Sequence, residues 1–437
     1  MDSSLDPSGV PLDRRDGCLF IGGVSCEAFL QEADSAYVYD LASVRSQVEA
    51  LDVLPSGVSP YYAVKANPAL ALVRFISQRG LGLDVASKGE LYCAQRAGHD
   101  MRRTVVTGPA KSPAELQAAL DAGVRYVNCE SLAEARTLSA LAVSAGTRQD
   151  VLLRVNTSFE MSGGSIRTTG GSQKFGVDQE AVPEAARIIL ELPGIRLAGI
   201  HCFSASNILD AGVLAENAAK ILSLASAFED ELGTRFETVD IGGGIGIPYV
   251  VGQPAFDLNR FSERLESARS SYDRPLIMEL GRFIVGPSGY YLSRVRDVKP
   301  SRGRQIVLTA GGINHQLRPA LMGSHPVVLA NRDASPTASS LVGGPLCTSL
   351  DCFVTDAPFP ECRPGDVVAV LQSGAYGYTE GMQSFLSYDQ PPEYCVLHGA
   401  ARLTRPAVLA ESRVDVQSVF DSEPSSAGVF AAGDARV

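Results

Sequence analysis

A single lysine, Lys65, stands at the end of the short apolar stretch 61–66 and is followed by Asn67-Pro68. The pattern predicts a buried strand that carries an amine near its carboxyl end. Burying an ammonium is unfavourable because its charge loses water, and the same loss lowers its pKa and makes the amine nucleophilic. A lysine that reaches solvent is the alternative. The residues further along the chain favour the nucleophile.

Other polar residues of distinctive types also follow short apolar stretches. Glu279 is a carboxylate that could hold a protonated ring nitrogen, and His201 offers a flat ring. A plain ion pair between Glu279 and Arg282, and a core position for His201, are the structural alternatives. The remaining residues of this kind are Asp84, Arg154 and the glycine run 242–244.

The glycine run 242–244 favours a phosphate site, because glycines let backbone N–H groups approach an anion closely. Ile247 occupies the place where a dinucleotide fingerprint requires a small residue, which disfavours a nicotinamide cofactor.

Together, the lysine, carboxylate, histidine and glycine-run residues match the needs of pyridoxal phosphate. Lys65 would bind the cofactor covalently, and Glu279 would keep its ring nitrogen protonated so that the ring accepts electrons. His201 would stack on the ring. The phosphate would be bound by Ser204, Gly243, Gly244, Gly281, Arg282 and Tyr376.

Eight strands, each followed by room for a helix except at the end, should position these residues. The strands are expected at 61–66, 83–86, 105–108, 126–129, 152–156, 197–203, 238–242 and 276–279. Such a repeat predicts a (β/α)8 TIM barrel, whose chemistry gathers at the carboxyl ends of the strands. An open doubly wound sheet is the second choice. Capping boxes at Ser87–Glu90, Ser112–Glu115 and Ser131–Glu134 predict helix starts.

The sequence pattern changes after residue 290, where short β-type runs separated by Gly and Pro replace the alternation of strands and helices. We predict a barrel over 36–290 and a C-terminal all-β domain over 291–415, which the segment 1–35 joins. Residues 416–437 read as a disordered tail.

Composition limits the class of protein. The 437 residues carry a formal net charge of −11, which argues against nucleic acid or membrane partners. No apolar run is long enough to cross a bilayer, and the N-terminus lacks a signal-peptide core. Nine cysteines without a CxxC pair suggest a cytoplasmic protein. Five histidines without metal-binding spacing predict no catalytic metal.

Seven motifs in order resemble the fold-type III pyridoxal phosphate decarboxylases, the family of the diaminopimelate, ornithine and arginine decarboxylases. The resemblance implies that Asp84, Arg154 and Tyr376 also contact the cofactor. It further implies a homodimer with shared active sites, in which Cys347 enters the partner's site as a proton donor. The motifs are Tyr62-Ala63-Val64-Lys65-Ala66-Asn67, Asp84-Val85-Ala86-Ser87-x-x-Glu90, His201-x-x-Ser204, Gly242-Gly243-Gly244, Glu279-x-Gly281-Arg282, Gly344-Pro345-x-Cys347-x-x-x-Asp351 and Gly374-Ala375-Tyr376.

Departures from these motifs bear on the substrate, for which we predict contacts from Arg318, Cys347, Asp351 and Tyr376. The resemblance implies a carboxylate at position 348, as in the diaminopimelate and ornithine decarboxylases, but this chain has Thr348 there. It also implies a tyrosine that helps to bind the distal carboxylate of the substrate, but this chain has Met322 there. The loop that carries Cys347 and a glycine-rich insertion at 161–175 are similar to those of one subgroup of the family, whose members act in specialised biosynthesis. One member of that subgroup decarboxylates glutamyl groups on an acyl carrier protein. We therefore expect an amino-acid decarboxylase of a biosynthetic pathway, acting on a free or carrier-bound substrate. Diaminopimelate decarboxylase, a racemase on a similar barrel and a catalytically silent homologue are the alternatives.

Overall fold

Eight parallel strands close into a barrel in the computed structural model, which describes residues 12–159, 166–167, 171–250, 252–323 and 325–418. The strands pair in the order β9-β12-β14-β15-β5-β6-β7-β8, and β8 pairs with β9 to complete the ring. This closure confirms the predicted barrel and excludes the open doubly wound sheet. The strands are β5 (Val58–Ala63), β6 (Gly82–Val85), β7 (Thr104–Val106), β8 (Tyr126–Cys129), β9 (Gln149–Asn156), β12 (Ile195–His201), β14 (Thr238–Gly243) and β15 (Leu276–Leu280).

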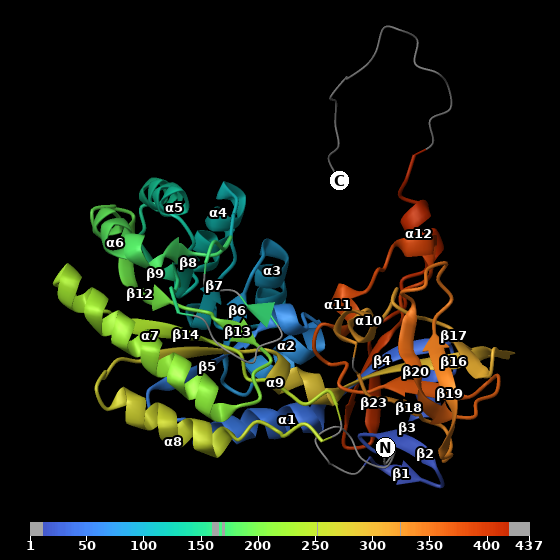
Figure 1. Cartoon of the computed structure of the whole chain (residues 1–437). Coiled ribbons are helices and arrows are strands. Elements are labelled where there is room, and N and C mark those ends of the chain that lie inside the picture. Colours follow the sequence, from blue (N-terminus) through green and yellow to red (C-terminus); the bar gives the residue numbers. More distant parts are fainter. Residues whose placement is uncertain (1–11, 160–165, 168–170, 251, 324, 419–437) are drawn as a thin grey trace, which may run out of the picture.

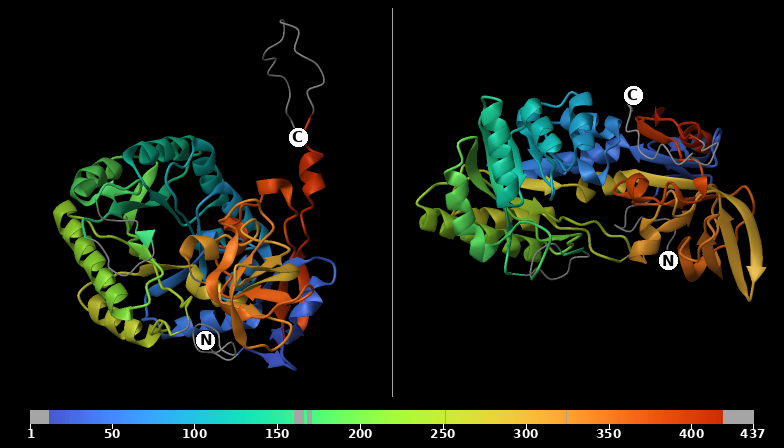
Figure 2. Two further views of the ribbon diagram at one scale, coloured as in Figure 1. Left: turned by 45° about the vertical axis from the view of Figure 1, so that its right-hand side comes forward. Right: turned by 90° about the horizontal axis from the view of Figure 1, so that it is seen from above.

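A ring of helices surrounds the barrel (Figures 1 and 2). Their apolar faces cover the strands; in α2, for example, Leu72, Val73 and Ile76 are fully buried. The short helix α9 (Arg282–Val285) follows the last strand. The longer helices are α1 (Leu41–Ala50), α2 (Leu70–Ser77), α3 (Lys88–Arg96), α4 (Pro113–Ala122), α5 (Leu132–Ser144), α6 (Val182–Leu190), α7 (Ala211–Leu232) and α8 (Leu258–Arg269).

One of the three predicted capping boxes forms completely. Ser112 and Glu115 satisfy each other's backbone N–H groups at the start of α4. Ser87 caps the backbone of Glu90, but the Glu90 carboxylate accepts instead from the Ala86 N–H. The difference follows from the backbone, because Ser87 is fully extended (φ −158°) whereas Ser112 is not (φ −67°), so their N–H groups point in different directions.

A mixed β-sheet forms the second part of the molecule, to the right of the barrel in Figure 1. Its strands pair in the order β20-β19-β17-β16-β4-β22-β23, and β21 joins β16 and β18 at the side of this path. The sequence predicts short β runs here at 305–309, 326–330, 366–371 and 394–398, which match β17, β18, β21 and β22, but it does not predict β16, β19, β20 or β23. The strands are β4 (Ser35–Asp40), β16 (Gly289–Ser301), β17 (Arg304–Thr309), β18 (Val327–Leu329), β19 (Pro336–Gly343), β20 (Cys352–Pro360), β21 (Val367–Val370), β22 (Glu393–Leu397) and β23 (Ala400–Arg405).

Strand β4 lies in this second sheet, between β16 and β22, although the sequence suggested that the barrel begins at residue 36. An apolar strand followed by a helix looks the same in either setting, and only the pairing tells them apart. The small strands β1 (Arg14–Arg15), β2 (Cys18–Ile21) and β3 (Val24–Ser25) lie nearby. Leu19 and Ile21 share a buried cluster with Val38, Leu292 and Val367.

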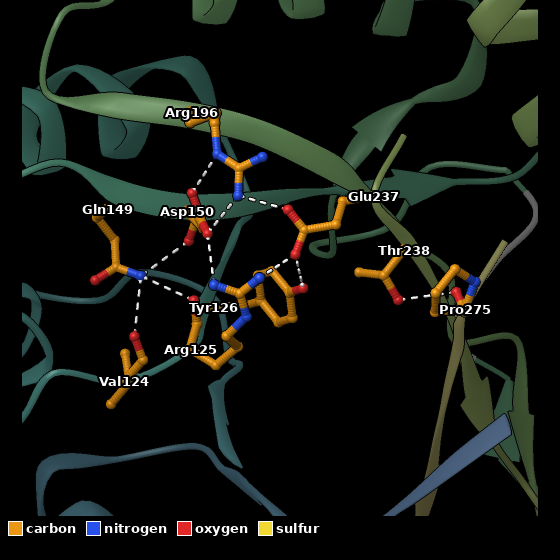
Figure 3. A network of polar contacts seen from close by, with 9 residues as sticks. All are labelled: Val124, Arg125, Tyr126, Gln149, Asp150, Arg196, Glu237, Thr238 and Pro275. Carbon is orange, nitrogen blue, oxygen red and sulfur yellow. Dashed lines mark hydrogen bonds and ion pairs between the residues drawn. The ribbon is translucent and has the colours of Figure 1, made fainter. Parts of the chain in front are cut away.

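The end of the barrel where the strands begin is closed by a charged network (Figure 3). The Arg196 guanidinium donates to Asp150 and to Glu237, each at 2.6 Å. Arg125 pairs with the same two carboxylates, and the Tyr126 hydroxyl donates to Glu237 at 2.9 Å. These residues come from the starts of β8, β9, β12 and β14, so the network ties four strands together at the end opposite the predicted chemistry.

Among the described residues, no helix is both long and apolar enough to cross a membrane. The predicted tail 416–437 is described only as far as residue 418, and the insertion 161–175 only at 166–167 and 171–175.

Candidate active site

Lys65 lies in a single helical turn, Val64–Ala66, directly after β5. Its Nζ donates to Asp84 Oδ2 at 2.7 Å and lies 3.7 Å from Glu279 Oε2. Burial lowers the pKa of Lys65, but the negative charges of Asp84 and Glu279 outweigh burial and raise it overall. The predicted lowering of this pKa is therefore wrong for the amine as the structure shows it. The sequence predicted a buried amine, whereas the Lys65 side chain is 35% exposed, and it did not show the two carboxylates beside the amine.

Glu279 and His201 lie on β15 and β12, and both are buried. The closest approach between them is 3.4 Å, from His201 Nε2 to Glu279 Oε1. Burial, helped by the positive charges of Arg154 and Lys65, holds the pKa of His201 well below its usual range, so its ring is neutral. Burial and the nearby Asp84 raise the pKa of Glu279 to about 7. The predicted flat ring and carboxylate are thus brought together beside Lys65, and the structure adds that the ring is neutral.

Arg154 on β9 is held by Glu130, whose Oε1 accepts from Arg154 Nη1 at 2.6 Å. Its guanidinium also lies over the Phe175 ring, 4.5 Å from the centroid. These contacts fix a buried cation beside the site, which opposes protonation of His201. The contact with the cofactor that we predicted for Arg154 stays a prediction.

The glycine run turns sharply at the end of β14. Gly242 (φ +67°) and Gly244 (φ +113°) adopt left-handed conformations that favour glycine. A Cβ added to Gly243 would lie 1.7 Å from the backbone oxygen of Glu279. Gly243 therefore allows β14 and β15 to approach closely. The sequence suggested a role for Gly243 at the phosphate but not this one.

Ser204, Arg282 and Tyr376 were predicted to bind the phosphate. Ser204 and Arg282 are buried, and the Ser204 Oγ and the Arg282 Nε have no hydrogen-bond partner among the described residues. Arg282 Nη1 donates to the Tyr249 hydroxyl at 2.5 Å, and its guanidinium lies 5.0 Å from the Tyr376 ring centroid. Tyr376 is strained (φ +60°), and its N–H donates to the Ala66 carbonyl at 2.7 Å, next to Lys65.

Arg318, a predicted substrate contact, is buried at the start of α10 (Arg318–Met322). Its guanidinium pairs with Glu380 at 3.0 Å and lies 4.4 Å from the centroid of the Tyr376 ring. The Tyr376 ring therefore contacts the guanidinium groups of both Arg318 and Arg282. Arg318 is thus a second cation close to the residues around Lys65.

Cys347 lies in the loop between β19 and β20, and its thiol is exposed. No hydrogen bond or ion pair that the structure describes joins it to the residues around Lys65. Asp351, in the same loop, is buried and accepts from the Ile313 N–H and the Leu346 N–H, both at 2.7 Å. Asp351 therefore shapes the loop that presents Cys347, and both of its carboxylate oxygens are already engaged.

Several residues of the site were missed. Asp240 precedes the glycine run and faces Glu279, and the Phe203 ring lies 5.7 Å from Lys65 Nζ. Tyr249 holds Arg282, and Glu130 holds Arg154. For Asp240, Phe203 and Tyr249, the only sequence signal was a polar or aromatic residue within a few positions of a predicted site residue, which is too common to single them out. Glu130 lies 24 positions from Arg154, and no signal in the sequence joins the two.

The residues present fit pyridoxal phosphate. Buried polar side-chain atoms without a hydrogen-bond partner occur at several places in the described part of the chain, and five of them lie on residues chosen for that cofactor. These five are both ring nitrogens of His201, Glu279 Oε1, Ser204 Oγ and Arg282 Nε. Buried polar atoms normally find partners, so a polar ligand between these residues would satisfy them.

Comparison with known proteins agrees with this chemistry. Residues 41–286, more than half of the chain, match the family described as pyridoxal-dependent decarboxylase, pyridoxal binding domain. A diaminopimelate decarboxylase from Methanothermobacter thermautotrophicus is 34% identical over 89% of this chain and 93% of its own length. The L-glutamyl-[BtrI acyl-carrier protein] decarboxylase of Niallia circulans is 27% identical over 88% of this chain and 94% of its own.

A solved structure supports the fold over nearly its full length. The diaminopimelate decarboxylase from Helicobacter pylori, in complex with L-lysine, superimposes with a TM-score of 0.83 at 28% identity, covering 89% of this chain and 98% of that one. The match spans both the barrel and the β-rich part. On the site geometry and these similarities together, the chain belongs to the pyridoxal-dependent decarboxylases and is an amino-acid decarboxylase that uses pyridoxal phosphate.

Proposed function

We propose that this enzyme removes the α-carboxylate of an amino acid whose side chain ends in a second carboxylate, with diaminopimelate as the first candidate substrate. The observation that carries the proposal is the buried Arg318, stacked on Tyr376 beside the residues around Lys65. Nε and Nη2 of Arg318 pair with Glu380, so its remaining N–H groups would bind the substrate carboxylate. A site built on such a charge-assisted contact discriminates against substrates that lack the carboxylate. The 34% identity to a diaminopimelate decarboxylase over 89% of this chain supports the same choice.

A carrier-bound glutamyl group is the second candidate, and the loop around Cys347 favours it. Thr348 provides no carboxylate for a distal ammonium, and Met322 provides no hydroxyl. A site without a matching group discriminates weakly for a charged amine. The similarity to the glutamyl-carrier-protein decarboxylase supports this candidate at 27% identity.

The chain's own residues divide the chemistry between them. When bound, pyridoxal phosphate supplies an electron sink that stabilises the electron pair left by the departing CO2. Lys65 would hold the cofactor covalently, and Glu279 would accept a hydrogen bond from its ring nitrogen. Ser204 and Arg282 would hold its phosphate, using atoms that are buried without a partner. The neutral His201 would cover one face of the ring without adding a charge.

The proposal is tested by measuring CO2 release from free diaminopimelate, lysine, ornithine and glutamate and from a glutamyl thioester of pantetheine. We expect diaminopimelate to give the highest kcat/KM. Faster turnover of the thioester would favour the second candidate, and racemised acid without amine would contradict both.

Arg318→Ala should raise KM for diaminopimelate at least tenfold, since it removes a charge-assisted contact of about 1.5–3 kcal/mol. Arg304→Ala is the matched control, because Arg304 pairs with Asp356 at the surface of the β-rich sheet. An unchanged KM in Arg318→Ala would remove the substrate role of Arg318.

A further inference from the structure

Asp240 and Glu279 are two carboxylic groups on the adjacent strands β14 and β15, with side chains close to one another inside the barrel. Their residues are 0% and 3% exposed. One ligand atom each from Asp240, Glu279 and His201 lie within 4.8 Å of one another. Asp240 Oδ1 accepts from the Gly242 N–H at 2.9 Å. Asp240 Oδ2 and Glu279 Oε1 are buried, and neither receives a hydrogen bond from the described residues.

Two ionised carboxylates this close together in a buried site are energetically unfavourable. Their repulsion is strong where water is excluded, and a buried acceptor without a donor is unfavourable in itself. One proton shared between the two groups removes the repulsion and gives both oxygens a partner. His201 cannot supply that proton, because burial and the charges of Arg154 and Lys65 keep the pKa of its ring well below the usual range.

The surroundings decide which carboxyl group holds the proton. Lys65 Nζ lies 3.7 Å from Glu279, where its positive charge favours the ionised form of that carboxylate. For Asp240, burial and the negative charges of Glu279 and Asp84 all favour the neutral form, and they raise its pKa well above the usual range. Burial and the charge of Asp84 also raise the pKa of Glu279, but there the positive charges of Lys65 and Arg154 oppose them.

We propose that Asp240 is a positioning residue that stays neutral and donates its proton in a hydrogen bond to Glu279. Glu279 thereby keeps its negative charge and a fixed orientation, with its other oxygen available to the ring nitrogen of the cofactor. The arrangement explains why an acid precedes the glycine run. Asp240 Oδ1 accepts from the Gly242 N–H and fixes the turn, and the hydroxyl on Oδ2 donates to Glu279. The inference rests on the family's cofactor and is independent of which amino acid is the substrate.

Two substitutions of Asp240 separate a neutral acid from an anion. Asp240→Asn keeps an acceptor for the Gly242 N–H and an N–H donor for Glu279, whereas Asp240→Ala keeps neither. We expect Asp240→Ala to weaken the equilibrium binding of pyridoxal phosphate and to lower kcat, each by about tenfold or more. Asp240→Asn should recover most of both losses. If Asp240→Asn is as impaired as Asp240→Ala, Asp240 acts through its negative charge and the proposal is wrong.

Infrared spectroscopy of the cofactor-free protein tests the proton directly and does not depend on activity. The difference between the wild type and Asp240→Asn should contain the C=O stretch of a protonated carboxylic acid at neutral pH. Asp366→Asn is the control, because Asp366 is buried but pairs with Arg332 at 2.8 Å, so its difference spectrum should show only carboxylate bands. Carboxylate bands alone for Asp240 would overturn the proposal. Should Asp240→Asn fail to fold, the protonated-acid band is sought in wild-type protein labelled with 13C-carboxyl aspartate, and its absence would likewise overturn it.

Discussion

Lys65 shows how the neighbours of one residue change its chemistry. Alone on an apolar stretch, its amine would have a lowered pKa because burial disfavours charge. In the folded protein, Asp84 at 2.7 Å and Glu279 at 3.7 Å raise that pKa instead. The amine is thus held as an ammonium, and it must lose a proton and leave this ion pair before it can bind the cofactor covalently. The two carboxylates that hold it are also the nearest groups that could accept that proton.

Lys65→Ala should reduce decarboxylation by on the order of a thousandfold or more, since Lys65 would supply the amine for the covalent step. The absorbance of the covalently bound cofactor should disappear at the same time. Lys220→Ala is the control, because Lys220 pairs with Glu216 on the exposed face of α7 and such pairs contribute little. Retained decarboxylation in Lys65→Ala would contradict the assignment of this residue.

At the scale of the strands, the site depends on how closely β14 approaches β15. Gly243 faces the Glu279 backbone, and any side chain there would collide with it. The same two strands carry Asp240 and Glu279, so a change in their spacing would separate the two carboxyl groups. The opposite end of the barrel is fixed by the charged network around Glu237 (Figure 3).

Gly243→Ala should destabilise the protein by about 1–3 kcal/mol, because its Cβ would push the two strands apart. Denaturant unfolding measures this change. Gly89→Ala provides the contrast: Gly89 lies inside α3 with its nearest neighbour 3.7 Å from the added Cβ. There the same substitution should stabilise by about 0.5–1 kcal/mol. Equal effects at both positions would contradict the close packing described for Gly243.

Glu237→Gln should make the barrel less stable above about pH 5 and have a smaller effect in acid. Burial raises the pKa of Glu237, but Arg196, Tyr126 and Arg125 outweigh burial and lower it overall. A carboxylate with a lowered pKa in the folded state stabilises above its unfolded pKa, and this contribution is lost as pH falls through the folded value. We expect the melting temperature to drop by roughly 1–3 °C at neutral pH.

Glu231→Gln is the matched control for this prediction, because Glu231 pairs with Arg187 on the exposed surface between α6 and α7. It should change the melting temperature little at any pH. A difference between Glu237→Gln and wild type that grows towards acid would show that the network does not depend on ionised Glu237.

At the scale of the whole molecule, we propose that two chains complete each other's sites. The exposed Cys347 sits on a loop that Asp351 fixes from within, and no hydrogen bond or ion pair of the described residues connects it to Lys65. An exposed thiol on a loop that a buried carboxylate shapes fits the prediction, made from the family resemblance, that Cys347 enters the site of a partner chain. A homodimer would then have two identical sites, each with residues from both chains.

Mixing subunits tests this arrangement. Lys65→Ala and Cys347→Ala should each have little activity alone, and Cys347→Ala should also divert product to the aldehyde. Random mixing of both should restore about a quarter of the wild-type activity, because half of the dimers would be mixed and each would have one intact site. Cys352→Ala, a neighbour of Cys347 at the start of β20, is the control. No recovery on mixing would place both residues in the site of one chain.

The sequence by itself determined the barrel, the cofactor and the residues at the strand ends, because the period of the apolar pattern and a few residue types carry that information locally. Lys65, His201 and Glu279, which the structure places side by side, were selected in this way. Strand β4 falls inside the predicted barrel domain 36–290 but pairs in the second sheet, since an apolar strand is compatible with both and only hydrogen-bond pairing decides.

Only the tertiary structure decided the electrostatics of the site. Asp240 and Glu279 are 39 positions apart in the chain, and the contact between them exists because β14 and β15 are neighbours in the closed barrel. The raised pKa of Lys65 likewise depends on Asp84 and Glu279, which come from two other strands. Charge interactions depend on distance in space, and the pattern of one strand contains no information about the residues on the next.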